Sequence, residues 1–81
     1  MVCPRVTRAK ALGGFRIYLC FNDGVEGEVD LSDDLWGEVF EPLRDPSYFA
    51  QFSVDDTLVW PNGADFAPEF LYERVRAAVR Q

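Results

Sequence analysis

Two prolines and an Asn-Gly pair restrict the backbone of residues 57–73 more strongly than any other part of the chain. Trp60 precedes Pro61 and is therefore held extended, which favours a short strand before a turn. Pro61 presets the first turn angle, and the Asn-Gly pair tolerates the left-handed conformation that can end such a turn. Pro68 suits the first position of a helix. We therefore expect Asp65, just ahead of it, to accept hydrogen bonds from free backbone N–H groups and so to fasten both the turn and the start of the helix. The stretch predicts a strand, a tight turn and a helix.

Residues 15–21 alternate apolar and polar side chains, as a half-buried strand does. Asn22-Asp23-Gly24 follows as a hairpin turn, and its length decides which face the next strand buries. A two-residue loop would put Glu26, Glu28 and Asp30 on the face of Phe21, and burying carboxylates is costly. A three-residue loop with a left-handed Gly24 pairs Phe21 with Val25 and Ile17 with Val29, and it sets Arg16 opposite Asp30. The three-residue loop is our prediction.

The other elements are shorter. Residues 5–12 predict a first strand, and an odd loop around Gly13-Gly14 keeps Arg8 and Lys10 off the apolar face. Residues 31–43 predict an irregular loop with one short helix, because Gly37 and Pro42 interrupt anything longer. Asp45-Pro46 caps and opens a short helix near residues 46–51, and strands 52–54 and 57–60 form a second hairpin. The last helix runs from Pro68 to about Arg80, with Leu71, Val75 and Ala78 in its apolar stripe and Phe70 and Val79 beside it.

Strands that precede the main helix, joined by short connections, predict an α+β fold. We expect a small antiparallel sheet of two short hairpins, covered by the C-terminal helix. The chain has 81 residues and 48% apolar residues, which is enough for one small core. Residues 1–81 are therefore predicted to form a single domain.

The formal charge of −6 is unevenly distributed along the chain. Residues 1–16 carry four basic groups and no acidic one, whereas residues 17–43 carry eight acidic groups and no basic one. Such a surface repels nucleic acid over most of its extent. It suits a basic protein partner, although an acidic surface also serves simply to keep a small domain soluble.

Chemistry-bearing residues are scarce. The chain has no histidine, and its two cysteines, Cys3 and Cys20, are too few and too far apart for a zinc site or a redox pair. We therefore expect no metal, no cofactor and no enzymatic activity. With no visible signal peptide or membrane span, we expect a cytoplasmic protein with reduced thiols. The alternative is a small ligand-sensing or hydrolytic domain that uses Asp65 and Glu69 beside Trp60.

Aromatic side chains make up 15% of the chain, more than one helix and a small sheet can easily bury. Some of them should form the edge of the core, and the remainder should form an exposed apolar patch of the kind that marks a partner site. The predicted partner-binding residues are Trp36, Phe40, Trp60, Asn62 and Tyr72. The expected partner is another small, basic protein, and a second copy of the chain is the alternative.

Several of these segments together resemble a known family. They are Phe-Asn-Asp-Gly (21–24), Val-Asp-Leu (29–31), the run from Val39 to Phe49, Leu-Val-Trp-Pro-Asn-Gly-Ala-Asp (58–65) and Pro-Glu-Phe-Leu-Tyr-Glu (68–73). In this order they resemble the bacterial domain of unknown function 2442. The resemblance implies a small α+β domain, similar to the N-terminal domain of a two-domain protein whose second part is helix-turn-helix. It also implies a neighbouring gene for a second small protein, as in toxin–antitoxin pairs. The sequence stops at Gln81, so we expect no DNA-reading helix, and the resemblance assigns no catalytic residue.

Overall fold

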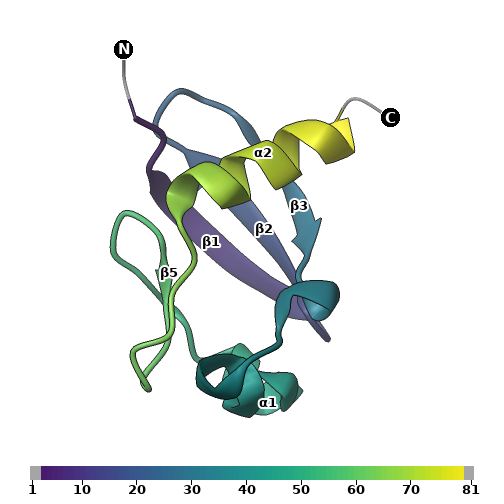
Figure 1. Cartoon of the computed structure of the whole chain (residues 1–81). Coiled ribbons are helices and arrows are strands. Elements are labelled where there is room, and N and C mark those ends of the chain that lie inside the picture. Colours follow the sequence, from purple (N-terminus) through teal and green to yellow (C-terminus); the bar gives the residue numbers. More distant parts are fainter. Residues whose placement is uncertain (1–2, 80–81) are drawn as a thin grey trace.

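Three antiparallel strands and one long helix make up most of the regular structure in the computed structural model, which describes residues 3–79. The strands are β1 (Val6–Gly13), β2 (Arg16–Phe21) and β3 (Glu26–Asp30), in the order β1-β2-β3. Helix α2 (Pro68–Val79) lies across one face of this sheet (Figure 1). The predicted α+β class and the covering helix are confirmed.

The β2–β3 hairpin has the predicted register. Phe21 N–H donates to the carbonyl of Val25 over 2.8 Å, Ile17 pairs with Val29, and Gly24 has a φ of 92°. The carboxylates of β3 therefore stay on the face that α2 does not cover. Arg16 lies opposite Asp30, as predicted, but its ion pair is with Glu28, at 3.1 Å between Nε and Oε1.

The β1–β2 connection reaches the predicted polarity by a different route. Gly13 pairs with Arg16, which leaves a two-residue turn, and Ala11 pairs with Ile17. Leu12 is therefore an extra residue, a β-bulge, that restores the pattern an odd loop would have produced. As a result Arg8 and Lys10 are exposed.

Between the sheet and the second hairpin the chain forms short helices around one end of the molecule (Figure 1). Two are 3₁₀ helices, η1 (Ser32–Asp34) and η2 (Glu38–Arg44), where we predicted a loop with one short helix. The third, α1 (Pro46–Phe49), is capped as predicted, because the Asp45 carboxylate accepts a hydrogen bond from Ser47 N–H over 3.0 Å. Pro42 lies inside η2, where it has no N–H to continue an α-helix.

Strands β4 (Ser53–Val54) and β5 (Leu58–Val59) form the predicted second hairpin. It joins the larger sheet through a bridge, in which Val6 N–H donates to the carbonyl of Asp56 over 2.9 Å. Thr57 is buried at the start of β5, and its hydroxyl donates to the carbonyl of Phe66. The second hairpin is therefore fixed on both sides, to β1 and to the segment that leads into α2.

The turn after β5 repeats the loop between β2 and β3. Trp60 N–H donates to the carbonyl of Ala64, Gly63 N–H donates back to Trp60, and the φ of Gly63 is 88°. Asn62 closes this turn through its side-chain oxygen, which accepts from Ala64 N–H over 3.1 Å. The prediction that Asp65 fastens the turn and caps α2 is wrong. Its carboxylate accepts no hydrogen bond within residues 3–79, and its backbone bridges to Val59 instead.

The core lies between the sheet and α2. Ile17 and Leu19 from β2 belong to the same buried cluster as Leu71 and Val75 from α2, and all four side chains are fully buried. The predicted apolar stripe of the helix is confirmed at these two positions, and its continuation at Ala78 lies outside the residues whose side chains are described. The core extends from the sheet to Phe49 in α1 and Trp60 after β5, which are also buried.

Candidate functional site

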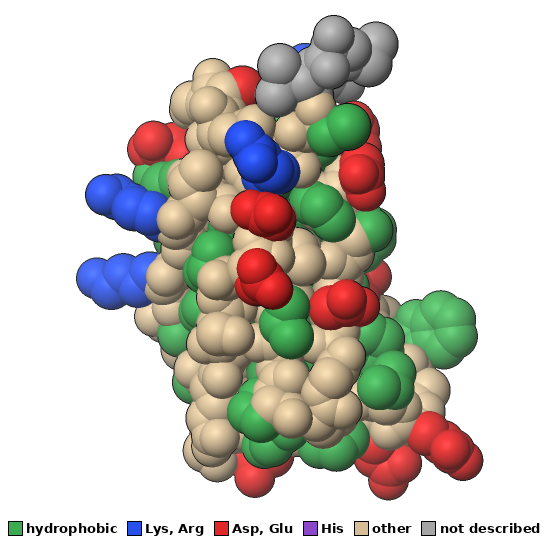
Figure 2. Space-filling view, turned by 90° about the vertical axis from the view of Figure 1, so that its left-hand side faces the viewer, with side chains coloured by type: hydrophobic (Ala, Val, Ile, Leu, Met, Phe, Trp, Pro, Cys, Tyr) green, Lys and Arg blue, Asp and Glu red, His purple; other side chains and the backbone are tan. Residues whose placement is uncertain are grey.

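An apolar groove opens between the 3₁₀ segments and the start of α2. Its volume is about 430 Å³, and its lining consists of Asp34, Trp36, Val39, Phe40, Asp65, Phe66, Ala67 and Phe70. Trp36 is 72% exposed and Val39 49% exposed, unusually high values for large apolar side chains in so small a protein. Figure 2 shows hydrophobic side chains lying among acidic ones toward its right-hand side.

The floor of the groove is a row of three stacked rings. Phe40 stacks on Phe66 at 4.9 Å between ring centroids, and Phe66 stacks on Phe70 at 5.6 Å. Trp60 supports the middle ring from inside, edge-on to Phe66 at 5.7 Å, and its indole N–H donates to the carbonyl of Phe49 over 2.8 Å. The floor therefore rests on a buried core residue, and the groove is already formed in the chain without a partner.

Two polar side chains hold the walls in place. Asn62 Nδ2 donates to the carbonyl of Val39 over 2.9 Å, which ties η2 to the turn after β5. The Arg74 guanidinium lies 5.5 Å from the centre of the Phe70 ring and pairs with Asp34 at 2.8 Å. The second bond of Arg74, to the carbonyl of Asp30 over 3.1 Å, fixes α2 against the end of β3. Of the two carboxylates in the groove, Asp34 and Asp65, these contacts engage only Asp34.

Asp34 is neutralised by Arg74, whereas the exposed Asp65 has no ion pair within residues 3–79. The groove therefore presents one uncompensated negative charge beside an exposed indole and a row of phenyl rings. Aromatic faces attract cations, and a carboxylate at the rim adds to that attraction. The arrangement suits an apolar segment that carries a lysine or arginine.

The five predicted partner-binding residues do not form one patch. Trp36 and Phe40 line the groove, and Asn62 braces its wall. Trp60 is only 2% exposed, so the prediction that it contributes to the surface is wrong. Its size and its bonded N–H make it a core residue. Tyr72 lies elsewhere, with its ring edge-on to Phe21 at 5.1 Å and its hydroxyl bonded to the Asp23 carboxylate.

Sequence reasoning missed Val39, Phe66 and Phe70 as groove residues. The sequence places Phe70 beside the apolar stripe of the helix and gives no role to Phe66. The four-residue spacing of Phe66 and Phe70 is not a helical signal, because Phe66 precedes Pro68, the first residue of α2.

The structure also separates Asp65 from Glu69. Asp65 lies in the groove, whereas Glu69 faces a second hollow of about 240 Å³, shared with Pro4, Asn22, Asp23, Tyr72 and Glu73. Trp60 is buried and lines neither hollow. The alternative prediction of an Asp65 and Glu69 pair beside Trp60 therefore has no common site.

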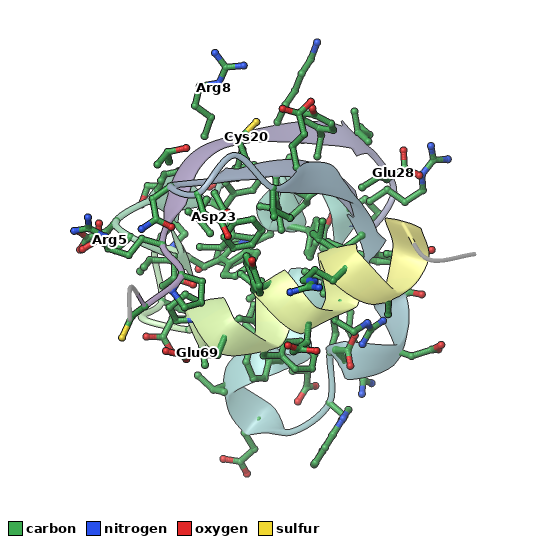
Figure 3. The ribbon with its side chains drawn as sticks, turned by 90° about the horizontal axis from the view of Figure 1, so that it is seen from above. Arg5, Arg8, Cys20, Asp23, Glu28 and Glu69 are labelled. Atoms are coloured by element: carbon green, nitrogen blue, oxygen red, sulfur yellow. The ribbon has the colours of Figure 1, made fainter. Side chains whose placement is uncertain are left out.

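In the second hollow, the hydrogen bond from the Tyr72 hydroxyl holds the pKa of Asp23 below its ordinary value. The same bond raises the pKa of Tyr72. Figure 3 shows Asp23 directed between sheet and helix, whereas Glu69 points away from the sheet. This hydrogen bond fastens the hairpin loop to α2, which is a structural role.

Within residues 3–79, no three His, Cys, Asp or Glu side chains come together in a group that could hold a metal ion. Cys3 and Cys20 are both free thiols. No helix in the described part of the chain has the length and apolar character needed to cross a bilayer.

Comparison with curated proteins and with solved structures finds no match. The family model described as Protein of unknown function (DUF2442) matches residues 6–77. This range includes all the strands, the short helices, the groove and α2 except its last two residues. The two-domain helix-turn-helix resemblance remains a prediction. The chain belongs to the DUF2442 family.

Proposed function

We propose that this chain is a non-enzymatic, cytoplasmic protein-interaction domain, and that the groove binds a segment of a partner through apolar and basic side chains. The observation that carries the proposal is the exposed Trp36 beside a pre-formed aromatic floor. Exposed aromatic surface is enriched at the centres of protein interfaces. Asp65, which has no ion pair within the described residues, and the net charge of −6 both favour a basic partner. Opposite charge speeds the encounter with such a partner and disfavours acidic ones.

A more specific form of the proposal is that the chain is the neutralising, antitoxin-like half of a two-gene pair. It is supported by the acidic surface and by the resemblance described above. On this view the partner is a small basic protein encoded next to this chain. Co-expression tests it directly, because growth arrest caused by the neighbouring protein should be relieved by the parent chain and not by a groove variant.

Capture from the native host tests the interaction itself. Tagged parent chain is compared with Trp36→Ser. Leu12→Ser serves as the control, because Leu12 is an exposed apolar residue outside the groove, at 39% on β1. We expect a basic protein to be retained by the parent and by Leu12→Ser, and lost with Trp36→Ser. With the purified partner, calorimetry should show binding weakened by about 30-fold, the usual scale for a central tryptophan.

Asp65→Asn separates the electrostatic from the apolar contribution. It should weaken binding by less than Trp36→Ser, and the loss should diminish at high salt. A captured protein that binds Trp36→Ser as well as the parent would contradict the groove assignment. A metabolite retained in place of a protein would favour the ligand-sensing alternative, since 430 Å³ is within the usual range of small-molecule sites.

A further inference from the structure

The sheet has a second face on the side away from α2. It is bordered by Val54 of β4, which lines a hollow there with Arg8, Lys10, Tyr18 and Cys20. Cross-strand pairing places Arg8, Cys20 and Glu26 in one row across this face, and Lys10, Tyr18 and Glu28 in the next row. Figure 3 shows Arg8 and Cys20 projecting away from the helix. We call this the outer face. It shares no residue with the aromatic groove.

Charge on the outer face is graded from one edge of the sheet to the other. The outward side chains of β1 are basic (Arg8, Lys10), and those of β3 are acidic (Glu26, Glu28, Asp30). Tyr18 and Cys20 lie between them on β2 and are half-buried. Within the described chain Glu28 is paired with Arg16, and Tyr18 donates to Glu26, whereas Arg8 and Lys10 form no ion pair. The basic edge is therefore the uncompensated one.

We propose that the outer face binds a second copy of this chain, face to face, about a two-fold axis that runs along β2. A rotation about this axis turns the second sheet over and exchanges its edges, so the basic β1 row of each copy lies over the acidic β3 row of the other. A closed two-fold dimer forms both sets of contacts twice.

Other arrangements bring like charges together. A two-fold axis across the strands would stack β1 on β1 and β3 on β3. Pairing the two β3 edges side by side would place both acidic rows within about 5 Å of one another, and directly opposed like charges are destabilising. Pairing β1 with β3 edge to edge would be complementary, but it would leave a free edge at each end and grow into open chains.

The proposed axis makes specific contacts. Arg8 lies over Glu26 of the second copy, and Lys10 over Glu28 of the second copy. Residues on the axis face their own counterparts, so Cys20 lies over Cys20 of the second copy at the sheet-to-sheet spacing of about 10 Å. The face measures roughly 14 by 20 Å from strand spacing and rise, which predicts a weak, salt-sensitive association.

Charge exchange between two variants tests the arrangement. Arg8→Glu with Lys10→Glu makes the charged positions 8, 10, 26 and 28 all acidic (the all-acidic variant), and Glu26→Lys with Glu28→Lys makes the same positions all basic (the all-basic variant). Sedimentation equilibrium at low salt should show each variant alone associating at least about 10-fold more weakly than the parent, since two attractive contacts become repulsive in each half of the dimer. An equimolar mixture of the two should recover a dimer of parent-like affinity. Glu41→Lys, an exposed acid on η2, is the control and should leave the dimer unchanged.

Cross-linking tests the position of the axis. In a Cys3→Ser background, a bismaleimide shorter than the sheet-to-sheet spacing of about 10 Å should join Cys20 to Cys20 of the second copy, because both sulfurs project into the gap between the sheets. The cross-link should disappear in the all-acidic variant and at high salt. Circular dichroism checks that each variant is folded.

Three results would overturn the proposal: a parent chain that is monomeric at millimolar concentration, association that both charge variants retain, or open-ended polymers in place of dimers. Because the groove is not involved, Trp36→Ser should dimerise like the parent, so failure here is distinguishable from failure of the proposed function.

Discussion

Asn62 should contribute more to stability than its exposed position suggests. Its side chain makes two hydrogen bonds, from Nδ2 to the carbonyl of Val39 and from Ala64 N–H to Oδ1. Ala64 is only 2% exposed, so Asn62→Ala leaves its N–H without a replacement partner, whereas water can reach the Val39 carbonyl at the surface. A net hydrogen bond contributes about 0.5–1.5 kcal/mol, so we expect Asn62→Ala to lower the free energy of unfolding by about 1–2 kcal/mol.

Backbone strain does not complicate this substitution, because Asp56 is the non-glycine residue with positive φ within residues 3–79, and Asn62 is not. Asn62→Asp keeps the acceptor for Ala64 and loses the donor, so it should cost about half as much. Asp65→Ala is the matched control and should stay within about 0.5 kcal/mol of the parent.

Urea denaturation with an unchanged slope measures all three variants. The reasoning fails if Asn62→Ala is as stable as the parent, or if Asp65→Ala is the more damaging change. The second outcome would restore Asp65 as the residue that fastens the turn.

Three further predictions concern single residues. Gly24→Val should destabilise the chain by about 1–2 kcal/mol, because a β-branched residue is strained at a φ of 92°, and an unchanged denaturation midpoint would contradict the hairpin register. Thr57→Val removes the buried bond to the Phe66 carbonyl and should cost about 1–3 kcal/mol by the same assay, whereas Thr57→Ser should retain most of the stability. The pKa of Asp23 is lowered in the folded state by Tyr72, so its contribution is present above the ordinary carboxyl range and is lost as the pH falls through the lowered value. Acid titration of stability should therefore show a smaller loss below about pH 4 in Tyr72→Phe than in the parent, and identical acid curves would exclude this linkage.

Much of the sheet was predictable because its register depends on whether each connecting loop has an odd or an even number of residues. Burying Glu26, Glu28 and Asp30 is so unfavourable that polarity alone selects the three-residue loop, and the structure agrees. The same argument gave the correct faces for Arg8 and Lys10, although it could not distinguish an odd loop from a two-residue turn with a bulge at Leu12. The alternation of side chains determines which face a residue occupies, but more than one turn geometry produces the same alternation.

The groove was less predictable because its parts come from distant segments. Phe40 meets Phe66 across 26 residues of sequence, as their numbering shows, through a contact that depends on where η2 comes to rest. Composition indicated that aromatic surface was in excess, but could not show which tryptophan lies outside. Trp60 is buried because its N–H finds the Phe49 carbonyl, a partner invisible in the sequence.

The capping error has a similar cause. A carboxylate before a helix and an asparagine in a turn are both good local hydrogen-bond acceptors, and propensity alone ranks them together. The structure separates them because Val59 pairs with Asp65 through the backbone, which directs the Asp65 side chain outward to the groove. The loop between Trp60 and Ala64 has the same backbone hydrogen bonds as residues 21–25. Its conformation could therefore have been predicted from the first loop.

The contrasting positions of the two tryptophans give the chain separate optical reporters. Trp60, at 2% exposure, should emit at shorter wavelength and resist quenching by acrylamide, whereas Trp36, at 72%, should emit near the wavelength of indole in water and be quenched readily. Occupancy of the groove would shield the second emission without changing the first, and loss of the core would change the first. The fluorescence spectrum of the unlabelled protein can therefore distinguish a ligand that binds in the groove from one that unfolds the chain.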